Sequence, residues 1–248
     1  MVEELRRTLK RKVPLLAFFG GLAMLLHPLL RLITSLGRYT LHECYMFAFA
    51  TGDFTPFAAF FPAVMFATVF AEDYASGGIR MCMFRTGRMG YIRQRILTTI
   101  MGGGFSMAAY VILVLLFSAA FVRQPGTAES ADLLSRTLWG RYEFLTDYGG
   151  AGMYACKIVL AFLFGAVWAL FGLAVSALTA NIYCAVIVPL GVYMGLWYFL
   201  AGNPFNPIYL LRGDTTILPS VGFIFAVQLA AMAVLAAVSG LLIYRRTQ

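Results

Sequence analysis

Six apolar stretches, separated by short polar segments, run along the chain. A helix needs about 20 apolar residues to cross the hydrocarbon core of a bilayer, and each stretch comes close to that length. The pattern therefore predicts an all-α, polytopic membrane protein with a single transmembrane domain over residues 1–248. The six predicted transmembrane helices are Val13–Leu30, Phe54–Ala71, Ile96–Val122, Ile158–Leu178, Ile182–Ala201 and Val221–Ile243.

Lysine and arginine mark the predicted orientation. Twelve of the 19 basic residues lie in residues 1–12, 72–95, 179–181 and 244–248, which share one side of the membrane if both termini are cytoplasmic. Because basic residues gather in cytoplasmic loops, this distribution predicts a multi-pass protein of the cell membrane with both termini inside.

Residues 1–12 combine basic residues with a helical pattern of apolar positions. Apolar residues recur there at helical spacing, at Val2, Leu5, Leu9 and Val13. With basic residues on its other faces, this segment is predicted to be an amphipathic helix that lies in the cytoplasmic interface against anionic lipid. A basic tail that only sets the topology is the alternative.

The composition excludes several soluble classes of protein. Apolar residues make up 61% of the chain, and charged residues make up 12%, about half the usual soluble share. This composition excludes a cytosolic enzyme, a nucleic-acid-binding domain and a secreted disulfide scaffold. The net charge of +8 is attributed to topology signals, so we expect no nucleic-acid partner.

Residue patterns typical of catalysis or metal binding are missing from the sequence. The glycine clusters are not followed by the Lys-Ser or Lys-Thr pair of a P-loop, and no HExxH zinc motif occurs. The two histidines and four cysteines lack metal-ligand spacing. We therefore expect this chain to be no enzyme and to hold no metal and no cofactor.

Several residues inside the predicted spans are helix breakers or small. Pro56, Pro62, Pro189 and the run Gly102–Gly104 are expected to interrupt their helices, while Gly191 and Gly195 form a GxxxG pair suited to close helix contact. Gln228 is the most polar side chain well inside a span, so a titrating group for ion coupling is lacking there.

Residues 72–95, between the second and third predicted spans, are the most informative segment. Two acids, a glycine turn, an apolar run and basic residues follow one another along it: Glu72, Asp73, Gly77–Arg80, Met81–Phe84, Arg88, Tyr91 and Arg95. An apolar patch between arginines favours docking against a partner. A solvated loop whose arginines only set the topology is the alternative.

This order of an acid, Gly-Ile-Arg, Gly with Arg, and Tyr with a basic residue at the head of a span resembles the permease subunits of type-2 ABC transporters. The six spans, the cytoplasmic termini, the interfacial helix and the short linker between the fourth and fifth spans are also similar. The likeness extends to bacterial permeases of peptide export and lantibiotic immunity, including exporters of phenol-soluble modulins.

The resemblance implies that residues 72–95 contain a coupling helix that docks on a separate ABC ATPase, present in two copies, which would bind ATP and Mg²⁺. It also implies a second permease chain, identical or different. Residues 201–219 would fold partly back into the outer leaflet. The implied coupling interface consists of Glu72, Asp73, Gly77, Arg80, Arg88 and Tyr91.

Side chains of the second and fifth predicted spans are candidates for lining a translocation path. These candidates are Phe57, Phe61, Met65, Tyr193 and Trp197. An apolar, aromatic path suits an amphipathic peptide or a hydrophobic compound. Contact with membrane lipid or with neighbouring helices is the alternative for each of them.

Two other functions remain open at this point. A solute-capturing membrane subunit of a vitamin importer would bind a small molecule with high affinity on its own. A non-transporting scaffold or immunity protein would have no effect on any ATPase.

Overall fold

The computed structural model describes residues 12–31, 39–50, 53–121 and 137–247, and every regular element in these ranges is a helix. Five helices are long and apolar enough to cross a membrane. They are α2 (Lys12–Arg31), α7 (Arg88–Phe121), α9 (Glu143–Thr179, from Gly150 onward), α10 (Ile182–Phe199) and α12 (Val221–Arg246). The chain is therefore an all-helical, multi-pass membrane protein.

The second predicted span, Phe54–Ala71, is not one continuous α-helix. It consists of a 3₁₀ turn (η2, Thr55–Phe57), one α-helical turn (α4, Phe60–Pro62), a π-helical segment (η3, Ala63–Ala67) and α5 (Thr68–Ala75). Pro56 and Pro62 lack a backbone N–H, so each interrupts the regular hydrogen-bond ladder. For this reason the described part of the chain has five candidate spans where six were predicted.

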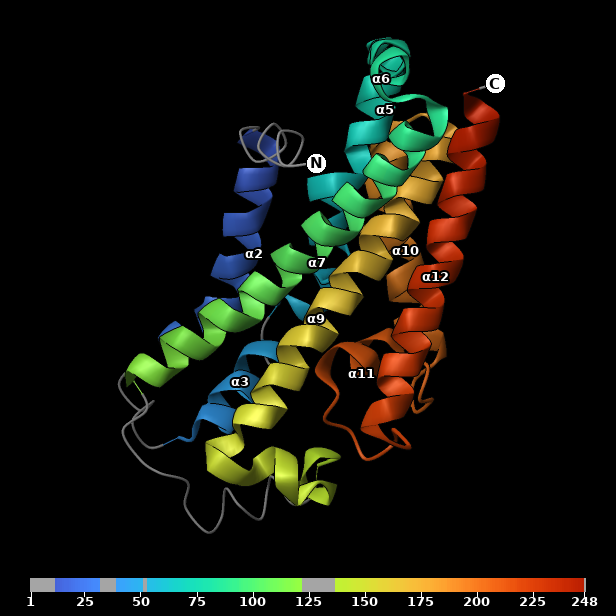
Figure 1. The fold of residues 1–248 in the computed structure, drawn as a ribbon. Coiled ribbons are helices and arrows are strands. Elements are labelled where there is room, and N and C mark those ends of the chain that lie inside the picture. The colour runs from blue at the N-terminus through green and yellow to red at the C-terminus, as the bar shows by residue number, and fades with distance from the viewer. Residues whose placement is uncertain (1–11, 32–38, 51–52, 122–136, 248) are drawn as a thin grey trace.

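The two longest helices, α7 and α9, run side by side through the centre of the bundle (Figure 1). The expectation that glycines and Pro189 interrupt helices was wrong, because α7 continues through Gly102–Gly104 and α10 through Pro189. These glycines instead allow close contact between neighbouring helices. A β-carbon on Gly165 would lie 2.2 Å from the carbonyl oxygen of Gly103, so only hydrogen at these positions permits the approach.

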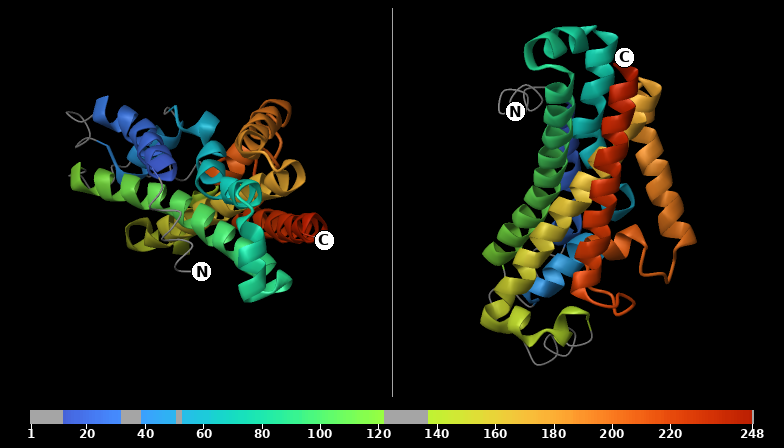
Figure 2. Two further views of the ribbon diagram at one scale, coloured as in Figure 1. Left: turned by 90° about the horizontal axis from the view of Figure 1, so that it is seen from above. Right: turned by 45° about the vertical axis from the view of Figure 1, so that its right-hand side comes forward.

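Two groups of elements flank this central pair. On one side α12 packs along α9, and α10 stands at the margin of the bundle with most of its surface exposed (Figure 2). On the other side α2 and α3 (Leu41–Ala50) pack against α7. Aromatic rings fill the core between them: Phe54 stacks on Phe61 at 5.1 Å between centroids, and Tyr110 meets both rings edge to face.

The two ends of the bundle differ. At one end α6 (Gly78–Thr86) lies next to the C-terminal end of α12, at the top of Figure 1. We call this the α6 end. At the opposite end lie α3, the 3₁₀ turn η4 (Trp139–Arg141) and α11 (Pro207–Arg212). Of residues 1–12, only Lys12 is described. The predicted interfacial helix therefore lies outside the described ranges.

The segment 201–219 bends back toward the bundle through Asn206. This buried side chain accepts a hydrogen bond from the N–H of Ile208 at 3.0 Å and so caps α11. Its amide nitrogen donates to the carbonyls of Trp197 and Leu200, at 3.0 and 3.1 Å. One side chain thus ties the start of α11 to the end of α10.

We predict that Gly165→Ala lowers the thermal unfolding temperature of the purified protein in detergent. The added methyl group would overlap the Gly103 carbonyl oxygen, and backbone atoms give way only if α7 and α9 separate. Overpacking of this kind costs about 1–3 kcal/mol, which exceeds the gain of about 1 kcal/mol in helix propensity.

The matched control is Gly191→Ala on α10, where a new β-carbon meets nothing within 4 Å. Its unfolding temperature should stay the same or rise slightly. Equal losses in both variants would contradict the proposed role of the α7–α9 contact.

Candidate functional site

The candidate site is at the α6 end, where two glycines turn the chain. Gly77 ends the turn after α5 with φ +70°, and Gly87 separates α6 from α7 with φ +72°. Both residues have a positive φ, which glycine adopts without the steric strain that a β-carbon would bring. These turns make α6 a separate short helix that lies across the end of the bundle (Figure 1).

Helix α6 exposes apolar side chains rather than burying them. Ile79 is its one buried residue, and it packs against Phe70 and Tyr91. Phe84 is 90% exposed and Met81 is 72% exposed, with arginines beside them. Large apolar side chains displayed together at the end of a helical bundle are typical of a protein–protein contact.

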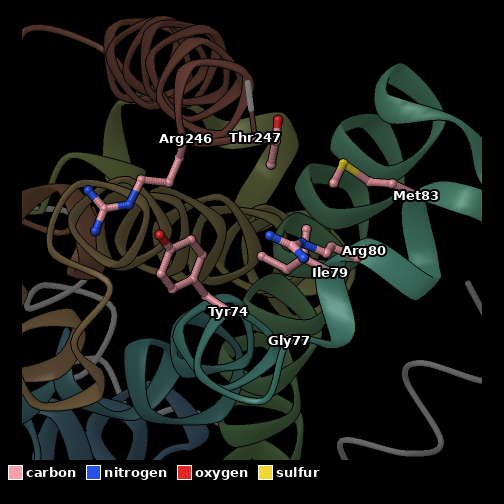
Figure 3. A pocket seen from close by; sticks show the side chains of 7 residues that line it. All are labelled: Tyr74, Gly77, Ile79, Arg80, Met83, Arg246 and Thr247. Atoms are coloured by element: carbon pink, nitrogen blue, oxygen red, sulfur yellow. The ribbon is translucent and has the colours of Figure 1, made fainter.

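A cleft of about 430 Å³ separates α6 from the end of α12 (Figure 3). Its lining residues are Tyr74, Gly77, Ile79, Arg80, Met83, Arg246 and Thr247. The Arg246 guanidinium lies 5.1 Å from the centroid of the Tyr74 ring and donates to the Leu178 carbonyl at 3.3 Å. Arg80 is exposed at the cleft, so the cleft combines an apolar floor with positive charge.

A buried ion pair supports this end of the bundle from inside. Asp73 of α5 and Arg95 of α7 form it, with 6% and 3% of their side chains exposed. The Arg95 guanidinium also lies 5.4 Å from the centroid of the buried Tyr91 ring. Because Arg95 balances Asp73, the exposed face of the α6 end keeps an excess of arginine charge.

The end of α12 is joined to the start of α7 through one arginine. Arg88 donates from Nη2 to the Thr247 carbonyl at 2.9 Å, and its guanidinium lies 5.1 Å from the Tyr244 ring centroid. The C-terminal end of α12 is therefore attached to the same elements that carry α6.

The six residues predicted for a coupling interface divide into two groups. Gly77 and Arg80 are exposed, and Glu72 and Arg88 are half-buried. Asp73 and Tyr91 are buried in the support beneath α6. The tertiary structure thus brings all six to one end of the molecule, two of them as internal supports.

Two of the predicted path residues line one apolar groove. Phe57 and Phe61 lie along a groove of about 540 Å³ between α2, the broken second span and α10. The groove's remaining lining residues are Val13, Leu16, Ala17, Gly20, Met24, Phe60, Val64 and Leu190.

The other three predicted path residues lie elsewhere. Met65 lines a second apolar cavity of about 360 Å³ between α2 and α7. Tyr193 is fully buried and donates its hydroxyl to the Thr55 carbonyl at 2.7 Å, which joins α10 to η2. Trp197 is half-buried near the far end of α10.

Sequence reasoning missed the contribution of the C-terminal end of α12 to the cleft. Arg246 and Thr247 line it, and Tyr244 packs against Arg88. The basic residues there were interpreted only as topology signals. Their distance along the chain from residues 72–95 left no pattern that could have joined the two segments.

The described side chains include no group of three or more His, Cys, Asp or Glu placed to hold a metal ion. Comparisons of the whole chain with protein-family models, with curated proteins and with solved structures gave no match.

We predict that Arg95→Met destabilises the protein by about 3–5 kcal/mol, because it leaves the Asp73 carboxylate buried without its counter-charge. The double variant Asp73→Asn with Arg95→Met should lose clearly less than the sum of the two single variants. Urea or thermal unfolding in detergent measures the difference, and Arg93→Met, on the exposed face of the same helix, should be close to neutral. Additive losses would argue against a coupled pair.

Proposed function

We propose that this chain is the transmembrane permease subunit of an ATP-driven ABC exporter, in which a partner ATPase docks on α6. The single observation that carries the proposal is the exposed, arginine-flanked apolar surface of α6 at the end of a helical membrane bundle. The likeness of residues 72–95 to the coupling segment of type-2 ABC permeases supports the same assignment.

In this proposal the α6 end faces the cytoplasm. Phe84 and Met81 insert into a hollow on one ATPase, while the surrounding arginines attract carboxylates at its rim. ATP and Mg²⁺ are bound by the ATPases, since the sequence of this chain has no P-loop.

The support beneath α6 suits the transmission of force. The Asp73–Arg95 pair joins α5 to α7, and Arg88 joins α7 to α12. A push on α6 would therefore move three elements together instead of being absorbed by a flexible loop. Closure of the ATPases would then bias the bundle between two arrangements, as in other nucleotide-driven switches.

The cargo would pass along the apolar groove that Phe57 and Phe61 line, once a second permease chain closes it. The exposed face of α10 is available for that chain: a β-carbon on Gly191 or on Gly195 would meet nothing within 4 Å. Since the described groove lining carries no charged side chain, an amphipathic peptide or a hydrophobic compound is the proposed cargo class.

The proposal is tested by co-expression with an ABC ATPase encoded beside this chain, followed by pull-down and an ATPase assay. Arg80→Glu places a negative charge at the cleft without removing a hydrogen bond of the described fold. Recovery of the ATPase should fall by about tenfold or more, because like charges across an interface cost several kcal/mol.

Arg93→Glu is the matched control, since it makes the same charge reversal on an exposed residue of α7 outside the cleft lining. It should retain the ATPase. If the wild-type chain binds no such ATPase, the export proposal is overturned and a scaffold or a solute-capturing subunit becomes the better explanation.

A second prediction concerns the groove. Gly20→Phe adds a ring to the groove wall, where a β-carbon meets nothing within 4 Å, so the fold should tolerate it. ATP-dependent uptake of a fluorescent amphipathic peptide into inside-out vesicles should fall several-fold while the ATPase stays bound. Ala233→Phe, on the exposed face of α12, is the control. Equal transport by both variants would place the cargo path elsewhere.

A further inference from the structure

Buried polar side chains gather at the end of the bundle opposite α6. They come from α3, η4, α9 and the segment after α11. Each has one buried polar atom without a hydrogen-bond partner in the described part of the chain: His42 Nδ1, Trp139 Nε1, Lys157 Nζ, Asp214 Oδ1 and Thr215 Oγ1. Buried polar atoms are normally paired, so five unpaired ones in one region indicate a site for a polar ligand.

Lys157 is the central member of this group. Its side chain is fully buried, and its Nζ lies 3.9 Å from the centroid of the Tyr45 ring and 5.7 Å from that of Trp139. Aromatic faces attract a cation, but the described residues offer Nζ of Lys157 no oxygen or nitrogen acceptor. A buried ammonium group without an acceptor is costly, and an ionisable residue inside a membrane helix commonly marks a functional site.

Backbone and ring contacts place Trp139 next to Asp214. The Leu138 N–H donates to the Asp214 carbonyl at 3.4 Å, which joins η4 to the segment after α11. A β-carbon on Gly213 would lie 3.1 Å from Cζ2 of Trp139, so the ring rests on the chain next to Asp214.

Within the group the charge of Lys157 opposes that of Asp214. Arg212 lies beside them and adds a positive charge, with its Nη2 3.3 Å from Oδ2 of Asp214. Burial, and after it the charge of Lys157, lowers the pKa of His42 to about 4, and Asp214 opposes this shift only in part. His42 is therefore neutral at pH 7. At its imidazole the charge of Lys157 has a larger effect than the opposing charge of Asp214.

His42 also lines a cleft of about 300 Å³, together with Tyr39, Met46 and Thr137. Glu43, at the same cleft, already accepts hydrogen bonds from the N–H and hydroxyl of Thr40, at 2.6 and 2.9 Å. Of the group, His42 alone lines this cleft, and the carboxylate at the cleft is engaged in capping α3.

We propose that this group is a binding site for one small monovalent anion, a halide or a carboxylate, held by the Lys157 ammonium and the Trp139 N–H. Thr215 is a further donor at its edge. The unpaired Oδ1 of Asp214 repels additional negative charge, so sulfate and phosphate are excluded. This site is independent of the proposed transport function.

The first test uses the full-length protein in detergent. Its unfolding temperature is measured as chloride replaces the bulky sulfonate MES at constant ionic strength, with formate as a separate arm for carboxylates. A ligand that binds only the folded state stabilises it, so chloride should raise the unfolding temperature by about 2–4 °C. Lys157→Met should lose this response, and Lys12→Met, at the exposed start of α2, should retain it.

A second readout follows the site directly. In a Trp168→Phe, Trp197→Phe background, Trp139 is the remaining tryptophan, and it is fully buried. Bromide should quench its fluorescence in a saturable manner, whereas collisions from bulk solvent would not saturate. Quenching that is linear in bromide, or identical in Lys157→Met, would overturn the proposal.

Asp214→Asn distinguishes anion binding by the group from a role of the group in stability alone. It removes the repelling charge but keeps the donors, so the variant should bind bromide several-fold more tightly and should respond to sulfate as well. It also tests the proposal if Lys157→Met fails to fold. Unchanged or weaker anion binding in Asp214→Asn would contradict the assignment.

Discussion

The contact between Gly103 and Gly165 is the constraint on which the rest of the structure depends. Helices in lipid gain little from burying apolar surface against each other, so close packing of small residues must hold them together. At these two glycines the backbones of α7 and α9 come so close that a β-carbon on either residue would overlap the other helix. Since α10 and α12 pack on α9 while α2 and α3 pack on α7, this contact positions both flanks of the bundle.

The buried acidic and basic side chains of the described ranges lie at the two ends of the bundle. At the α6 end, Asp73 and Arg95 neutralise each other inside the bundle, and that allows a helix with exposed Phe84 to be supported rigidly. At the opposite end, Lys157 of α9 is buried against aromatic rings, and its Nζ forms no hydrogen bond with a carboxylate of the described ranges. One end is thus paired internally, whereas at the other end Nζ of Lys157 and Oδ1 of Asp214 have no hydrogen-bond partner in the described ranges.

The broken second span is supported by a side chain of α10. Pro56 and Pro62 divide it into short helical pieces, and a π-helical segment follows Pro62. Irregular backbone at membrane depth is tolerated only where protein or a water-filled cavity surrounds it. Here Tyr193 of α10 satisfies the Thr55 carbonyl, while the apolar groove runs along the same segment.

Hydropathy by itself determined the all-helical membrane class and the approximate positions of the long helices, because the length and polarity of a stretch decide whether it can cross a bilayer. It could not show that Gly102–Gly104 are contact surfaces or that Pro62 precedes a π-helical segment. Lys157 was placed at the edge of a span, since the extension of α9 to Glu143 has no strong apolar signal. Only the tertiary structure buried Lys157 and brought Arg246 to α6, because these outcomes depend on which segments meet across the bundle.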